Sequence, residues 1–136
     1  TNVYNPAGEK LGSIDSIMID KLSGKVRYAV MEFGGFLGIG TERYPLPWDT
    51  LKYDTGMEGY VVSLSKEQLE GAPRYERDTT PEYTDEYGRR VYDHYGVPWI
   101  WVNIINSISL NSPHSRAIYF QINKNNFKNN LQREAL

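Results

Sequence analysis

The sequence predicts a mainly all-β protein, a small β-barrel followed by a short helix and a C-terminal helical extension. Residues 1–64 contain five or six short segments with strand character, separated by tight turns that contain glycine, proline or aspartate. No segment among them is long enough for the crossover helix of a βαβ unit. Helix signals appear only from Ser65 onward. These three observations favour a barrel over an α/β fold.

The clearest strand lies at residues 25–33. Before it, residues 2–5 form a short extended piece, and residues 11–20 form a strand that a turn at residues 23–25 connects to it. Apolar side chains occur at alternate positions on both faces of residues 25–33, so both faces are expected to be covered. We therefore predict that this strand is central in the sheet.

A loop that is rich in glycine and yet apolar follows this strand. Residues 34–40 include four glycines, and Phe36, Leu37 and Ile39 lie among them. A phosphate-binding loop would need a helix N-terminus behind it and usually a lysine after it, and residues 41–45 provide neither. Apolar side chains at the rim of a small barrel must be covered. The loop is therefore expected either to cap the barrel or to contact a partner.

The partner interpretation extends to the Pro47-Trp48 pair, because tryptophan is a frequent interface anchor. A tryptophan that covers the core or a sheet edge is the alternative. The candidate partner-binding residues are Gly34, Gly35, Phe36, Leu37, Gly38, Ile39, Pro47 and Trp48.

The rest of the predicted barrel is made of short strands. Residues 42–46 are expected to be extended, with Pro45 and Pro47 on an edge or at a bulge because proline cannot donate a ladder hydrogen bond. Residues 48–53 form a further strand or a turn leading into one. A turn at residues 54–59 then leads into a strand at residues 60–64.

Two helices are expected after the strands. Ser65 and Gln68 form a capping box that begins a short helix, which ends before Gly71. A second helix is predicted to begin at Thr80, with proline in its first turn, and to end at Gly96. Its apolar stripe has a spacing of four and consists of Tyr83, Tyr87, Val91 and Tyr95. Gly88 inside this helix is expected to weaken it by about 1 kcal/mol.

Composition divides the chain into three parts. Residues 1–75 form the predicted barrel domain and residues 76–101 a helical, aromatic extension. Residues 102–136 hold eight of the ten asparagines and none of the glycines. We consider two interpretations of this tail: a variable, disordered end of the domain, or a frameshifted or fused segment that is not native to it.

Composition also excludes several functions. The chain has no cysteine, which rules out disulfides, thiolate zinc sites and thiol nucleophiles. A net charge of −2 provides no general attraction for nucleic acid. His94 and His114 stand in no acid–base motif. We therefore expect a non-enzyme with no cofactor and no metal, cytoplasmic and without a membrane span, although a start at Thr1 leaves room for a trimmed targeting segment.

Several stretches of the sequence resemble the PRC-barrel domain, specifically the small free-standing bacterial proteins of that family. They are residues 8–14, 19–30, 33–40, 47–49 and 60–75. Residues 87–93 resemble the usual C-terminal extension of those proteins. The resemblance implies a six-stranded PRC-type β-barrel, as in the cytoplasmic domain of the photosynthetic reaction centre H subunit and the C-terminal domain of a ribosome maturation factor. In both relatives the barrel is a docking module without catalytic activity.

The function expected from this resemblance is a non-catalytic protein-interaction or assembly module that self-associates, with a homodimer as the expected state. Two alternatives remain. One is an adaptor in RNA metabolism or ribosome maturation, which rests on analogy alone. The other is a barrel that binds a small ligand.

Overall fold

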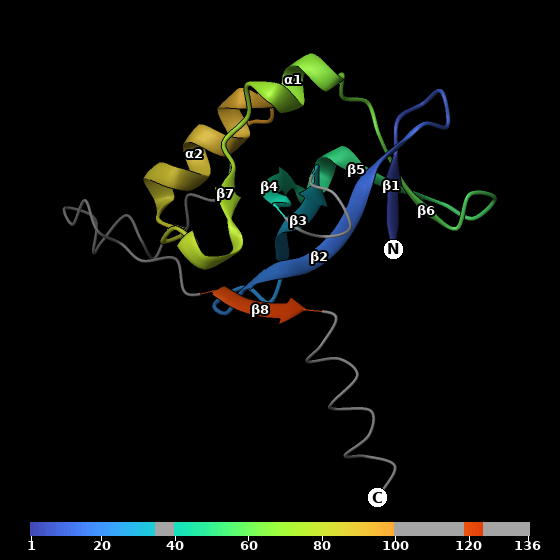
Figure 1. The fold of residues 1–136 in the computed structure, drawn as a ribbon. Helices are drawn as coiled ribbons and strands as arrows, with labels where there is room; N and C mark the ends of the chain where they lie inside the picture. Colours follow the sequence, from blue (N-terminus) through green and yellow to red (C-terminus); the bar gives the residue numbers. More distant parts are fainter. Residues whose placement is uncertain (35–39, 100–118, 124–136) are drawn as a thin grey trace, which may run out of the picture.

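The computed structural model of the chain describes residues 1–34, 40–99 and 119–123 (Figure 1). The strands in this part of the chain are β1 (Asn2–Tyr4), β2 (Lys10–Asp20), β3 (Val26–Phe33), β4 (Glu42–Pro47), β5 (Leu51–Asp54), β6 (Gly59–Val62), β7 (Tyr75–Glu76) and β8 (Tyr119–Asn123). The helices are α1 (Lys66–Glu70) and α2 (Asp85–His94), with short 3-10 turns η1 (Trp48–Thr50) and η2 (Arg77–Thr79). In Figure 1 the two helices lie together on one side of the sheet. The predicted mainly-β class is confirmed.

The described strands form one sheet in the order β5-β6-β1-β2-β3-β4-β7, and β8 pairs with β2. All of these pairs are antiparallel except β1 with β6, which run parallel. The sheet departs from the predicted six-stranded β-barrel: β1 to β6 lie within the predicted barrel domain, but β7 and β8 extend the sheet, and it is not closed into a barrel. In the described residues the sheet has eight strands, and its two ends, β5 and β7, do not pair with each other.

The outer edge of β4 is paired over a short length only. β7 pairs with β4 only at Glu42 and Arg43, and the chain then turns into η2. Beyond these two residues β4 carries Pro45 and Pro47, which have no N–H group for a further ladder. Helix α2 packs against β4 instead. The prediction that the two prolines lie on an edge is consistent with this arrangement.

Strand β3 is the centre of the molecule, as predicted. It pairs with β2 on one edge and with β4 on the other. Its Met31 packs in one core with residues of β1, β4, β6 and α1. Its Tyr28 and Val30 pack in a second core with residues of α2. The alternation of apolar residues on both faces therefore reflects a strand buried on both sides.

Helix α1 begins with the predicted capping box. The Gln68 backbone N–H donates to Ser65 Oγ at 3.1 Å, and the Ser65 backbone N–H donates to Gln68 Oε1 at 2.9 Å. Gly71 is the C-cap residue, as expected.

Helix α2 starts later than predicted. Its N-cap is Thr84, whose Oγ1 accepts a hydrogen bond from the Tyr87 backbone N–H at 3.1 Å. Thr80 has the same capping chemistry and is also followed by an acidic residue, Glu82, so neither the cap nor the first-turn charge distinguishes it from Thr84. The predicted end is confirmed: Tyr95 is the C-cap and Gly96 has φ +66°.

The tyrosines of α2 and of the segment before it pack onto the sheet. The Tyr28 ring lies edge-to-face with Tyr83 at 5.3 Å and with Tyr92 at 5.6 Å between centroids. The Tyr92 hydroxyl donates to the Arg27 carbonyl at 2.7 Å. Because Tyr28, Tyr83 and Tyr92 are buried, they are not available for stacking on single-stranded nucleic acid.

Alkaline pH is expected to unfold the protein because tyrosines in and around α2 are buried. Burial raises the pKa of Tyr83, Tyr87 and Tyr95 above the ordinary value of 10.0. The unfolded chain releases these protons at a lower pH than the folded chain, so stability that is complete below pH 10 is lost as the pH rises further. For the buried Tyr83 alone the expected loss is about 1.4 kcal/mol per pH unit. The part of the phenolate absorbance that comes from the buried tyrosines should appear together with the loss of the circular dichroism signal; phenolate absorbance that rises fully while the fold persists would contradict the prediction.

Part of the predicted tail joins the sheet. Within residues 102–136, strand β8 pairs with residues 16–20 of β2. Residues 102–118 and 124–136 lie outside the described part of the chain, so both interpretations of the tail stay untested. In the described ranges, no helix has the length and apolar character that crossing a membrane requires.

Candidate functional site

The predicted contact loop lies largely outside the described residues. Gly35, Phe36, Leu37, Gly38 and Ile39 fall in residues 35–39, and their role stays a prediction. Gly34, just before them, is exposed and has φ +83°, a conformation that favours glycine.

The two residues of the Pro47-Trp48 pair have different environments in the structure. Pro47 ends β4 opposite Tyr28 and is fully buried, so it is a packing residue and not part of a surface. Trp48 opens η1 and is half-buried. Its ring lies edge-to-face with Tyr60, with 5.7 Å between centroids.

A cluster of three aromatic rings is centred on Tyr60, which contacts both Trp48 and Tyr53. Tyr53 on β5 stands directly opposite Tyr60 on β6, with ring centroids 5.3 Å apart. Tyr53 is 57% exposed, one of the most exposed large apolar side chains in the described chain. We call Trp48, Tyr53 and Tyr60 the edge aromatic cluster. Edge-to-face rings hold one another in place, and rigid aromatic anchors of this kind are typical of interfaces.

The hairpin that carries this cluster is set by its turn. Asp54 Oδ1 accepts a hydrogen bond from the Met57 backbone N–H at 3.0 Å, and Glu58 takes φ +52°. This turn places Tyr53 opposite Tyr60. The sequence predicts this turn at residues 54–59. The pairing of the two tyrosines was missed, although the register of a hairpin follows from the position of its turn.

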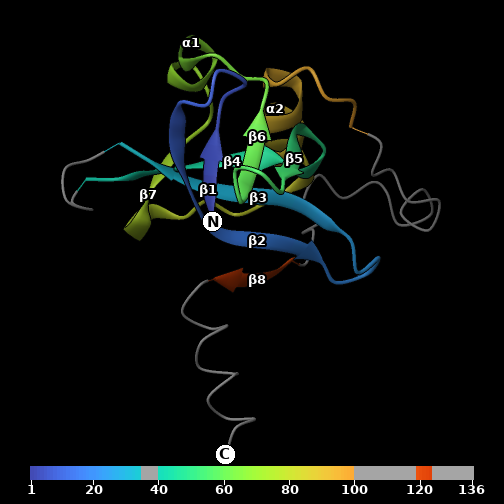
Figure 2. The same cartoon turned by 90° about the vertical axis from the view of Figure 1, so that its right-hand side faces the viewer.

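The cluster lies at an open edge of the sheet. β5 pairs with β6 on one edge (Figure 2), and no described strand pairs with its other edge. Leu51 packs against the core, while Lys52, Tyr53 and Asp54 are exposed. Because side chains alternate along a strand, Lys52 and Asp54 lie on the face opposite Tyr53. The outer edge of β5 therefore offers main-chain hydrogen-bonding groups flanked by one charge of each sign.

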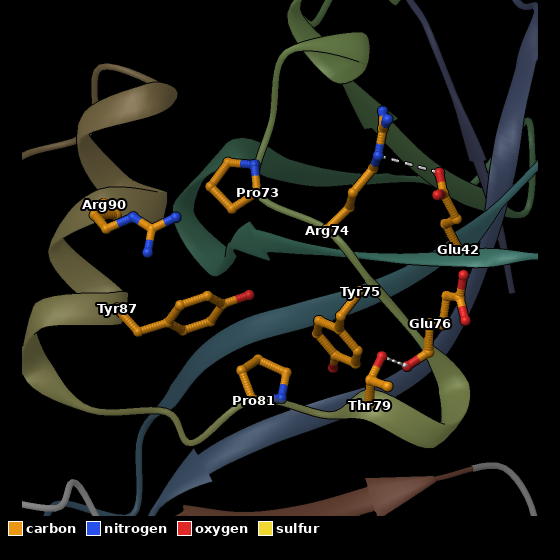
Figure 3. Close-up of a pocket in the computed structure, with 9 residues that line it drawn as sticks. All are labelled: Glu42, Pro73, Arg74, Tyr75, Glu76, Thr79, Pro81, Tyr87 and Arg90. Carbon is orange, nitrogen blue, oxygen red and sulfur yellow. Dashed lines mark hydrogen bonds and ion pairs between the residues drawn. The ribbon is translucent and has the colours of Figure 1, made fainter.

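A pocket of about 590 Å³ lies elsewhere, between α2 and the chain around β7 (Figure 3). Its lining residues are Glu42, Pro73, Arg74, Tyr75, Glu76, Thr79, Pro81, Tyr87 and Arg90. Arg74 forms an ion pair with Glu42, with 3.3 Å between Arg74 Nε and Glu42 Oε2. The Tyr87 ring extends from α2 toward Tyr75. The pocket lies outside the sheet, so the predicted binding of a small ligand within a barrel gains no support from it and stays a prediction.

The buried charges of the sheet are paired with one another. Arg43 Nη2 lies 2.8 Å from Glu32 Oε1, and Arg43 Nε lies 3.6 Å from Asp15 Oδ2. A second buried pair joins Arg27 to Asp20. These arginines are engaged with carboxylates, which leaves them poorly suited to bind phosphate.

The described histidine also has a structural contact. His94 Nε2 lies 2.7 Å from the Gln68 carbonyl oxygen and so connects α2 to α1. Across the described residues, no group of three or more His, Asp or Glu side chains is arranged to hold a metal ion. The expectation of a non-enzyme stays a prediction.

Comparison with known families places the N-terminal part of the chain. The family model described as the PRC-barrel domain matches residues 1–69, which run from the start of the chain into α1. No curated protein matches the chain. The matched residues cover just over half of the 136 residues and include six of the strands in the described sheet. The chain belongs to the PRC-barrel domain family.

Proposed function

We propose that this chain is a non-catalytic protein-interaction module that associates with a second copy of itself. Membership in the PRC-barrel family suggests a protein-interaction module in general. The observation that carries the proposal is the edge aromatic cluster, which stands beside a sheet edge that no described strand pairs with.

The physical argument starts from the exposure of Tyr53. A tyrosine buries on the order of 150–250 Å² when it is fully covered, and 57% of Tyr53 is exposed. At about 25 cal/mol per Å², covering this ring in a contact would contribute roughly 2–3 kcal/mol per copy before the costs of association. Tyr60 already restrains the Tyr53 ring, and Trp48 in turn packs on Tyr60, so little side-chain entropy is lost on binding.

The non-catalytic part of the proposal is supported by how the polar groups are used. Asp20, Glu32 and Asp15 face arginines, and His94 contacts a backbone carbonyl. Each of these groups therefore has a structural partner. General acid–base catalysis needs a titratable side chain that faces a substrate site.

Replacement of Tyr53 by serine is expected to shift the protein toward the monomer. The substitution removes the most exposed ring of the cluster at a position where the fold does not depend on burial. We expect self-association to weaken about tenfold or more, which corresponds to about 1.4 kcal/mol. Sedimentation equilibrium over a range of concentrations measures this shift.

A matched control is available in the turn between β2 and β3. Leu22 is 71% exposed and lies far from β5 in the order of strands, so Leu22→Ser removes an exposed apolar side chain without touching the cluster. Its association should equal that of the unaltered chain. An unaltered chain that stays monomeric at all concentrations would refute self-association. Equal loss in both variants would refute the role of the edge aromatic cluster.

A further inference from the structure

We infer that two copies pair through their β5 strands, which run antiparallel about a two-fold axis at Tyr53. This inference rests on the proposed self-association and names the contact that produces it. β5 is the end strand of the described sheet, and no strand in that part of the chain pairs with the main-chain groups of its outer edge. A second β5 would satisfy them by extending the sheet across the two copies.

Symmetry limits how two identical strands can meet. An antiparallel pair of identical edges needs a two-fold axis perpendicular to the sheet, and this rotation keeps the same face of both copies on the same side. Residues directly opposite each other must also point to the same face. A residue of β5 can therefore stand only opposite itself or opposite a residue two or four positions away.

Charge then selects one register among those that remain. With the axis at Tyr53, Lys52 stands opposite Asp54 of the second copy, and the same pair repeats by symmetry. With the axis at Lys52 or at Asp54, like charges stand directly opposite each other, which is destabilising. Lysine on a sheet edge normally discourages pairing. Here Asp54, two residues away, makes the edge self-complementary.

The other face of β5 agrees with this register. Tyr53 would meet Tyr53 of the second copy at the axis, and Tyr60 lies behind each ring at 5.3 Å. The aromatic rings of both copies thus meet on one face, while both Lys–Asp pairs lie on the other. Four residues form a short contact, so the buried area is expected to fall below about 1,200 Å², in the range of weak associations.

The first test uses disulfide formation, for which the chain is suited because it has no cysteine. In the proposed register residues 52 and 54 of different copies stand about 5 Å apart between Cα atoms. Residue 52 of one copy is roughly 8 Å or more from residue 52 of the other, too far for a disulfide. We expect a mixture of Lys52→Cys and Asp54→Cys to cross-link on mild oxidation, and each variant alone to cross-link much less.

The second test uses charge. In Lys52→Glu the introduced carboxylate faces Asp54 of the second copy twice in each dimer, so association should weaken about tenfold or more. Combining it with Asp54→Asn in the same chain should restore most of the association, because each introduced glutamate then faces a neutral amide. The asparagine side chain retains an Oδ1 that can accept the Met57 N–H bond of the turn. Circular dichroism of each variant confirms that the hairpin is folded.

The outcomes separate this inference from the proposed function. Cross-linking in the mixture together with charge rescue supports the register. Cross-linking of Lys52→Cys alone, or dimers that form equally well in Lys52→Glu, would overturn the register while self-association stands. A chain that is monomeric in every form would overturn the proposed self-association itself.

Discussion

Asp20→Ala is expected to lower the free energy of unfolding by about 3–5 kcal/mol, the range for removal of one partner from a buried ion pair. Asp20 and Arg27 are both buried, with 3% and 7% of their surfaces exposed. Asp20 Oδ2 accepts from Arg27 Nη2 and from Ser23 Oγ, while Oδ1 accepts from the Leu22 backbone N–H at 3.0 Å. One carboxylate therefore neutralises a buried cation and organises the turn between β2 and β3.

Two further variants show how much of the lost stability comes from the charge of Asp20 and how much from its hydrogen bonds in the turn. Asp20→Asn retains an acceptor for the Leu22 N–H and removes the charge, so it should recover the turn and still leave the Arg27 guanidinium without this carboxylate. We expect it to lose most of the stability that alanine loses. Asp49→Ala, at an exposed position, is the control and should stay within about 0.5 kcal/mol of the unaltered chain. Urea unfolding measures all three. A loss below about 1 kcal/mol in Asp20→Ala, measured against that control, would contradict the argument.

The parts of the fold that could be predicted are those determined by neighbours in the chain. The capping box at Ser65 depends on two residues three positions apart, and the centrality of β3 depends on alternation within eight residues. Closure of the barrel depends on whether β5 and β7 meet, which no local pattern encodes. The predicted start of α2 was wrong for a related reason. Thr80 and Thr84 have the same capping chemistry, and both are followed within two residues by an acidic side chain, so no local pattern distinguishes them.

In the candidate site, too, some residues could be predicted from the sequence and others could not. Trp48 could be selected because a tryptophan is conspicuous in any sequence. Its neighbours Tyr53 and Tyr60 are ordinary strand residues, and only the hairpin register brings the three rings together. The buried Asp20–Arg27 pair lies within the segment that resembled the family, but its chemistry requires both residues to point to the same buried face. Only the folded sheet brings these two side chains together.

Gly88→Ala is the second substitution with a large expected effect, and its sign is opposite to what helix propensity suggests. Alanine in the middle of α2 would gain about 1 kcal/mol of helix propensity over glycine. A Cβ at this position, however, would overlap the Tyr28 hydroxyl and lie 2.7 Å from Trp99 Cζ3. Tyr28 is fully buried and held between Tyr83 and Tyr92, so it has no room to move.

The steric cost should therefore exceed the gain in propensity. Overpacking of a filled core typically costs about 1–3 kcal/mol and occasionally more, and separating α2 from β3 would also loosen the contacts of Tyr92. We expect a net loss of roughly 2 kcal/mol in urea unfolding. Gly71→Ala is the matched control: its φ is −88° and its nearest non-neighbour atom would lie 3.6 Å from the new Cβ, so it should be neutral or slightly stabilising. If Gly88→Ala proved as stable as Gly71→Ala, the close approach of α2 to β3 would not be what requires glycine.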